Sequence, residues 1–155
     1  MAVHLLRHAH AGRRSEWVGD DSLRPLSDRG RMQALGVAAD LVDTPVGHVV
    51  SSPYVRCIET VEPLAAAMGL VVEPSDAFAE GMDGDAAYEM LAALDAVDGV
   101  ACSHGDVLPA LLRRLLTNGM ETDGPLLCQK GSMWIVEFRD GRPHRGRYLP
   151  PIDKR

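Results

Sequence analysis

Short apolar, β-prone runs alternate with longer segments of helical spacing along this chain, and this alternation limits the folds that the chain can adopt. The apolar runs are Val3–Leu6, His48–Ser51, Leu70–Glu73 and Gly99–Ser103. The segments with helical spacing are 27–44, 54–68, 86–97 and 107–116. Strands that alternate with helices in this way favour a parallel sheet covered by helices on both faces.

The last part of the chain has a different pattern. Residues Ser132–Arg139 alternate between apolar and polar, and Asp140-Gly141 then predicts a hairpin turn into Pro143–Leu149. The fold class that we expect is therefore α/β: a three-layer α/β/α sandwich with a mostly parallel central sheet and an antiparallel edge hairpin. We expect one domain over residues 1–155, with 150–155 as a frayed tail, and a kink or break at Pro63.

The charge of the chain is uneven. Its 155 residues are 46% hydrophobic and 25% charged, as in an ordinary globular domain with a core of its own. The net charge of −6 disfavours nucleic acid or an anionic membrane surface as a partner. Residues 1–31 nevertheless contain six arginines. We therefore expect a local anion site within an acidic protein.

Cysteine usage and hydropathy indicate a cytoplasmic protein. The three cysteines, Cys57, Cys102 and Cys128, are far apart and form no zinc-type or redox spacing. The apolar start is too short for a signal peptide, and no apolar run is long enough to cross a bilayer. We expect no cofactor and no metal.

Three of the predicted strands end in polar residues. Val3–Leu6 is followed by Arg7 and His8, Gly99–Ser103 by His104, and His48–Ser51 by a helix that carries Arg56. The carboxyl ends of parallel strands lie at one edge of a sheet, where ligands bind. We therefore expect these polar side chains to converge.

Two guanidiniums and two imidazoles in one pocket suit phosphoryl chemistry. Guanidiniums grip phosphate oxygens in pairs and stabilise the charge that spreads over them during transfer. One imidazole can attack phosphorus if its other nitrogen is held protonated by a backbone carbonyl, and water then hydrolyses the phosphohistidine. The other imidazole, when protonated, is a further clamp.

Four motifs carry a resemblance to a known family. They are Leu6-Arg7-His8-Ala9, Arg24-Pro25-Leu26-Ser27-Asp28-Arg29-Gly30, Ser51-Ser52-Pro53-Tyr54-Val55-Arg56-Cys57-Ile58-Glu59-Thr60 and Ser103-His104-Gly105. In this order they resemble the motifs of the histidine phosphatase (phosphoglycerate mutase-like) superfamily, over nearly the whole chain. The short length is similar to the SixA-type phosphohistidine phosphatases.

The resemblance implies a role for each matching residue. His8 would be the phosphorylated nucleophile, and Arg7, Arg56 and His104 would bind phosphate. The chain departs from the family pattern twice. Ala9 replaces the common glycine, and the polar residue that follows, usually asparagine, is replaced near Arg13 or Arg14. The resemblance thus implies a metal-independent phosphatase that acts through a covalent phosphohistidine.

The general acid is open. Glu80 lies where the superfamily often has an acidic residue, and Asp83, Asp85 or none of these could serve instead. An alkoxide leaving group needs a proton from such an acid, whereas the imidazole of a phosphohistidine leaves more readily. Because no general acid is clearly assigned, the sequence slightly favours substrates with a P–N bond, but it does not decide the substrate.

The sequence also suggests a rim of residues that could read further anionic groups on the substrate. These candidates are His10, Arg13, Arg14 and Arg24. The short loops indicate an exposed site, which suits phosphohistidine on a protein as well as a small phosphoester or a nucleotide.

Rival functions remain. His8-x-His10 is a metal-ligand spacing, but the third ligand is missing and the flanking arginines repel a cation. A non-catalytic phosphate-binding regulatory module would keep the fold without the chemistry. A mutase would need lid insertions for which this chain has little room.

Overall fold

The computed structural model describes all residues 1–155, and its elements follow the predicted order. They are β1 Ala2–Arg7, α1 Asp28–Asp40, β2 Val49–Ser51, α2 Val55–Met68, β3 Val72–Pro74, α3 Asp85–Asp95, β4 Val100–Ser103, α4 Val107–Thr117, β5 Met133–Arg139 and β6 Arg142–Leu149. The longest helix has 14 residues, and none is long and apolar enough to cross a membrane.

The six strands form one sheet in the order β3-β2-β4-β1-β5-β6. The first four are parallel to their neighbours, whereas β5 is antiparallel to β1 and forms an edge hairpin with β6. The two residues of the hairpin turn, Asp140 and Gly141, both have positive φ, as a tight two-residue turn requires. The predicted α/β fold class is confirmed.

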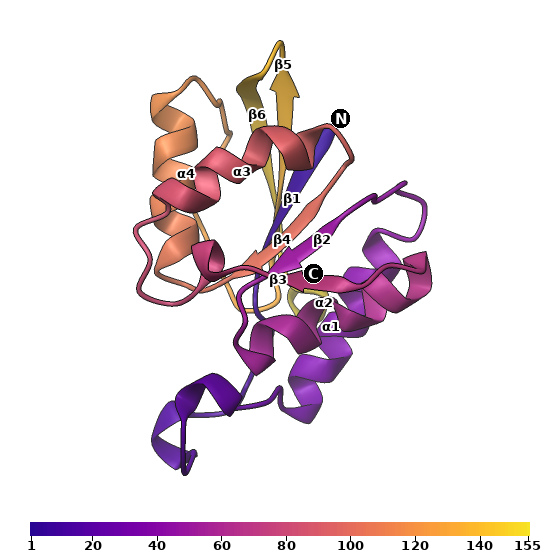
Figure 1. The fold of residues 1–155 in the computed structure, drawn as a ribbon, viewed down its shortest axis with the longest axis vertical. Coiled ribbons are helices and arrows are strands. Elements are labelled where there is room, and N and C mark those ends of the chain that lie inside the picture. The colour runs from indigo at the N-terminus through magenta and orange to yellow at the C-terminus, as the bar shows by residue number, and fades with distance from the viewer.

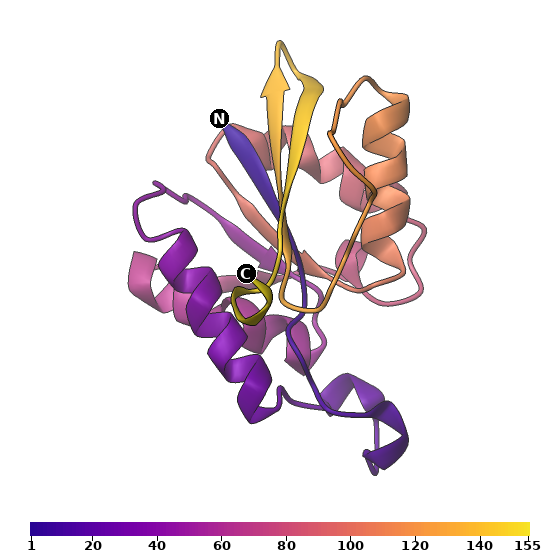
Figure 2. The ribbon, with the colours of Figure 1, turned by 180° about the vertical axis from the view of Figure 1, so that it is seen from behind.

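Helices cover both faces of this sheet (Figures 1 and 2). Helices α3 and α4 lie on one face, over a core that includes Leu5, Phe78 and Trp134. Helices α1 and α2 lie on the other face, over a core that includes Leu6 and Leu64. The alternation of side chains along β1 explains why Leu5 and Leu6 belong to different cores.

Two local expectations differ from the structure. Pro63 does not divide the predicted helix, because α2 runs through it to Met68 and ends at Gly69, whose φ of 67° is the left-handed cap.

The terminal residues are packed and do not form a frayed tail. Arg155 donates to both carboxylate oxygens of Asp40. Asp153 accepts from Arg29 and Gln33, and Ile152 packs on Gly36 of α1. These contacts lie more than 100 residues apart in sequence, so no local pattern indicates them.

Candidate active site

The parallel register brings three strand ends to one edge of the sheet. Arg7 at the end of β1 pairs with Ser103 at the end of β4, and Ser51 at the end of β2 pairs with Cys102. His8 and His104 each follow the end of their strand, and their ring centroids are 5.4 Å apart. The two imidazoles that the sequence singles out therefore lie side by side.

One hydrogen bond decides the tautomer of His8. Its Nδ1 lies 2.9 Å from the carbonyl oxygen of Ala9, which can only accept, so Nδ1 carries the proton and Nε2 keeps its lone pair. Burial, followed by the positive charges of His104 and the two arginines Arg56 and Arg7, lowers the pKa of His8 to about 3 against the opposing effect of this hydrogen bond. His8 is therefore a neutral imidazole with a free Nε2 at neutral pH.

The threonine of the Arg-x-x-x-Thr motif holds the peptide that follows His8. Thr60 lies one turn after Arg56 on α2 and donates to the Arg56 carbonyl at 2.7 Å. The hydroxyl oxygen of Thr60, Oγ1, in turn accepts from the Ala9 backbone N–H at 2.9 Å. Helix α2 thereby anchors the backbone of Ala9, the residue whose carbonyl sets the His8 tautomer.

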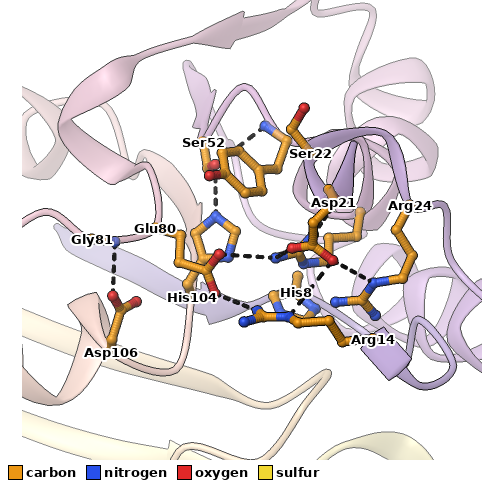
Figure 3. A network of polar contacts seen from close by, with 12 residues as sticks. His8, Arg14, Asp21, Ser22, Arg24, Ser52, Glu80, Gly81, His104 and Asp106 are labelled. Atoms are coloured by element: carbon orange, nitrogen blue, oxygen red, sulfur yellow. Dashed lines mark hydrogen bonds and ion pairs between the residues drawn. The ribbon is translucent and has the colours of Figure 1, made fainter. Parts of the chain in front are cut away.

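His104 is oriented by a side chain that the sequence does not single out. Its Nε2 lies 2.8 Å from Ser52 Oγ (Figure 3), and the Tyr54 ring packs edge-on at 4.8 Å. Ser52 Oγ also accepts from the Tyr54 backbone N–H at 3.3 Å. The Nδ1 atom of His104 is buried and has no partner, so it is available to a ligand.

The glycine after His104 makes room for Arg7. A Cβ on Gly105 would lie 2.6 Å from Cζ of Arg7, so no larger residue fits without moving the guanidinium. Arg7 donates from Nη1 to the Cys128 carbonyl at 2.8 Å, and burial lowers its pKa. Its buried Nε has no partner. The His-Gly motif is thus a steric requirement of Arg7.

Arg56 lies behind two carboxylates. It is fully buried, and its Nη1 donates to the Asp21 carbonyl at 2.9 Å. Its Nη2 lies 3.1 Å from Asp21 Oδ2 and 3.5 Å from Glu80 Oε2. Burial opposes ionisation of Asp21, but the Arg24 hydrogen bond and the charge of Arg56 outweigh it and lower the pKa of Asp21. The buried Nε and Nη2 atoms of Arg56 make no hydrogen bond, so its guanidinium keeps donors beside these two carboxylates.

These residues surround an open cavity of about 640 Å³ that no hydrophobic side chain lines. Its lining residues are Arg7, His8, Gly12, Arg13, Arg14, Ser15, Arg24, Glu80, His104, Gly105, Asp106 and Lys130. Five of these twelve are Arg or Lys, and two are acidic. The cavity is therefore strongly basic although the chain is acidic, and an anion is the ligand it suits.

Only one of the three acid candidates lines the cavity. Glu80 Oε1 accepts from Arg14 Nη2 at 2.6 Å, and this hydrogen bond raises the pKa of Arg14. Asp83 accepts from the backbone of Asp85, which pairs with Arg114, and neither borders the cavity.

An acid that the sequence does not single out, Asp106, also borders the cavity. Its Oδ2 accepts from the Gly81 backbone at 2.8 Å and so anchors the loop that carries Glu80 (Figure 3).

The structure places the rim candidates differently from one another. Arg13, Arg14 and Arg24 line the cavity. His10 does not: its Nδ1 lies 2.6 Å from Ser27 Oγ, and it borders a smaller hollow that it shares with Lys130. Nowhere in the molecule do three or more His, Cys, Asp or Glu side chains gather as a metal-binding group.

For three residues at or next to the site, the sequence does not predict the contacts that the structure shows: Asp21, Ser52 and Lys130. Ser52 stands inside a recognised motif, but only the structure shows that its hydroxyl contacts His104. Asp21 begins a short 3-10 turn between β1 and α1, and Lys130 stands in the turn before β5; single charged residues in such connections are normally solvated. No signal in the sequence separates these two from other loop charges.

A three-layer α/β fold with two histidines and two arginines at one edge of the sheet is typical of proteins that bind or transfer phosphoryl groups. The sequence model of the histidine phosphatase superfamily (branch 1) matches residues 3–93. The chain belongs to this superfamily.

Similar proteins agree with this assignment. The chain is 34% identical, over 99% of its length, to the 8-oxo-(d)GTP phosphatase of Mycolicibacterium smegmatis, and it spans about half (49%) of that protein. The structure of the protein histidine phosphatase SixA complexed with tungstate matches 100% of both chains, with a TM-score of 0.81 and 21% identity. A mycobacterial glucosyl-3-phosphoglycerate phosphatase matches 95% of this chain and 96% of its own, with a TM-score of 0.69 and 19% identity.

Proposed function

We propose that this chain is a phosphatase that acts through a phosphorylated His8. The observation that carries this proposal is the hydrogen bond from His8 Nδ1 to the Ala9 carbonyl, which leaves Nε2 as a nucleophile beside a basic cavity. Nε2 attacks phosphorus, the N–P bond forms, and the bond to the leaving group breaks with its electron pair. Water then attacks phosphorus, the N–P bond breaks, and orthophosphate departs.

The cations around His8 would stabilise the transition state. Arg7, Arg56 and His104 all have buried nitrogens without a hydrogen-bond partner: Nε of Arg7, Nε and Nη2 of Arg56, and Nδ1 of His104. Hydrogen-bond donors that are already in place stabilise the charge of the transition state more than donors that must first reorganise. Nη2 of Arg56 would exchange the Asp21 carboxylate for a phosphoryl oxygen.

Two substrate classes are supported by different observations. The fold likeness to SixA and the open cavity favour phosphohistidine on a protein. The named activity of the mycobacterial relative and the excess of cations favour a nucleotide or another small phosphorylated molecule. Neither class needs a strong general acid when the leaving group is an imidazole or a phosphate.

The test is replacement of His8. We expect His8→Ala to lower turnover of p-nitrophenyl phosphate and of a phosphohistidine protein by at least about 1,000-fold and to abolish an acid-labile phosphoenzyme. His10→Ala removes an imidazole two residues away that does not line the cavity, and should stay within about threefold of wild type. EDTA should leave the wild-type rate unchanged.

Two results would contradict the proposal. Unchanged turnover in His8→Ala would remove His8 as the nucleophile. Phosphate binding by the wild type without turnover of any substrate would show the non-catalytic regulatory module instead.

A further inference from the structure

Lys130 is a cation of the cavity wall that has no carboxylate partner. It stands near the end of the loop 118–131, just before β5, and lines the main cavity together with Arg7 and His8. The other cations of the wall are balanced differently: Arg14 pairs with Glu80 and Arg24 pairs with Asp21. Neither Lys130 nor Arg7 takes part in any salt bridge of the structure.

Backbone contacts hold Lys130 beside the proposed nucleophile. The Gly131 backbone N–H, one residue later, lies 3.2 Å from the Arg7 carbonyl and 3.1 Å from the His8 carbonyl. Arg7 in turn donates to the carbonyl of Cys128, two residues before Lys130. The segment that carries Lys130 is thus attached on both sides to the strand end that carries His8.

The charged neighbours of Lys130 are cations. Burial, followed by the positive charges of four arginines (Arg7, Arg24, Arg56 and Arg14), lowers the pKa of its ammonium. Like charges gathered in this way repel one another, and an anion bound among them relieves that repulsion. One phosphoryl group carries about two negative charges at pH 7. In the proposed function, Arg7, Arg56 and His104 bind that group.

Arg13 supplies a second uncommitted cation. Its nearest carboxylate is Glu16 at 3.9 Å, and both side chains are mostly exposed. An exposed pair at this distance contributes little, so Arg13 is free to bind a ligand. Lys130, which has no carboxylate partner, and Arg13, whose only ion pair is this exposed one, therefore remain as cations of the cavity for a second anionic group.

We propose that Lys130 and Arg13 form a second phosphate subsite, and that the substrate is a phosphoanhydride whose second phosphoryl group lies next to the one transferred to His8. This proposal rests on the proposed function and specifies its substrate class. The cavity of about 640 Å³ has room for more than one phosphoryl group.

The surroundings of Glu80 agree with an anhydride. Both carboxylate oxygens of Glu80 face guanidinium nitrogens, Oε1 that of Arg14 and Oε2 that of Arg56. In the reaction of an anhydride, His8 Nε2 bonds to the terminal phosphorus and the bridging P–O bond breaks. The electron pair leaves on a phosphate oxygen, which is a weak base and needs no proton donor. Water then releases orthophosphate and restores Nε2.

The experiment compares substrates that differ in the second phosphoryl group. Inorganic triphosphate is an anhydride without a base, p-nitrophenyl phosphate is a monoester, and a phosphohistidine protein is the third substrate. Lys130→Gln removes the charge, and Lys130→Arg keeps it. Lys154→Gln is the matched control, because Lys154 borders the smaller hollow next to Lys130 but not the main cavity.

The expected pattern is selective. Lys130→Gln should lower kcat/KM for triphosphate by about 10- to 100-fold, which is the effect of losing one charged contact to phosphate, and change p-nitrophenyl phosphate by less than about threefold. Lys130→Arg should restore most of the loss, and Lys154→Gln should match wild type. Pyrophosphate should inhibit wild type more strongly than orthophosphate does, and Lys130→Gln should remove that difference.

Each other outcome overturns the proposal. Equal losses on triphosphate and monoester would place Lys130 on the transferred phosphoryl group. Turnover of monoester or phosphohistidine protein through a phosphoenzyme, without turnover of triphosphate, would reject the anhydride and leave the proposed function standing. Absence of any phosphoenzyme with all three substrates would reject both.

Discussion

His8 and His104 are oriented by different kinds of partner. A backbone carbonyl holds Nδ1 of His8, and a serine hydroxyl holds Nε2 of His104. The carbonyl can only accept, so the tautomer of His8 is permanent, whereas a hydroxyl can donate or accept. The hydroxyl of Ser52 can therefore pair with Nε2 of His104 whether or not that nitrogen carries a proton.

Replacing Ser52 tests this reasoning. We expect Ser52→Ala to lower kcat by roughly 10-fold, because His104 loses the hydroxyl that orients its ring. The Cys57 sulfur, 3.5 Å from Nε2, then becomes the remaining neighbour of that nitrogen, so its hydrogen bonding changes. Nitrogen-15 chemical shifts of the His104 ring report this change directly.

Two further variants separate positioning from packing. Ser51→Ala removes an equally buried hydroxyl that donates to the Ser52 carbonyl and does not contact His104, so it should keep the wild-type nitrogen-15 shifts. Ser52→Thr retains a hydroxyl and should recover part of the rate. His104 ring nitrogen-15 shifts in Ser52→Ala that match those of the wild type would show that the hydroxyl does not control His104.

For single residues, the sequence predicts the site side chains that stand in motifs. It does not predict contacts between residues that are far apart in the chain. Arg7, His8 and His104 follow apolar strands directly, so a local pattern reveals their placement. The contact between Asp21 and Arg56 spans 35 residues and depends on how a loop folds over α2. Burial of Arg56 behind that loop is therefore not readable from the motif.

Helix α1 begins where the backbone after His8 leaves the sheet. The Ser27 side chain accepts from the Gly30 N–H as the predicted N-cap, and the Ser27 backbone N–H donates to the His10 carbonyl at 3.0 Å. A Cβ on Gly30 would lie 1.9 Å from that carbonyl oxygen. The glycine of this motif thus allows the first turn of α1 to pack directly against the residues that follow His8.

Gly30→Ala should destabilise the protein. The added methyl group overlaps backbone atoms that cannot rotate away, so we expect a loss of at least about 2 kcal/mol in the free energy of unfolding. For a chain of this size that corresponds to a fall in Tm of roughly 4–8 °C, measurable by circular dichroism.

A control on the same helix distinguishes this clash from a general effect on α1. Met32 is 65% exposed, and Met32→Ala should change the free energy of unfolding by less than about 0.5 kcal/mol. An unchanged Tm in Gly30→Ala would mean that the first turn of α1 does not lie against His10.

Elements are predictable here where the local signals agree. Ser27, Gly69 and Asp140-Gly141 mark a helix start, a helix end and a hairpin turn, and the structure confirms all three. A break at Pro63 does not occur, because the packing of α2 against the sheet outweighs the loss of one backbone hydrogen bond. Tertiary contacts of this kind are absent from any local window.

The whole molecule separates its charges, with a net charge of −6 and a cavity rich in Arg and Lys. Asp21 and Glu80 compensate part of the cavity charge from within. Such a field attracts small anions to one opening while it keeps the rest of the surface unattractive to polyanions such as nucleic acid. The cations of the cavity repel one another, and a bound anion reduces this repulsion in the folded state. Inorganic triphosphate should therefore also raise Tm.

The acid stability of the molecule should depend on its buried histidines. Burial lowers the pKa of His8 to about 3 and also lowers that of His4, so the folded chain binds fewer protons than the unfolded chain below pH 6.5. Stability is therefore full above the unfolded value and is lost as pH falls from 6.5 towards 3, by up to about 1.4 kcal/mol per pH unit for each such group. His8→Gln removes one group, so urea unfolding between pH 7.5 and 5 should show a shallower decline than in wild type. Equal declines would mean that His8 accepts a proton in the folded state, and would remove the neutral nucleophile on which the proposed reaction depends.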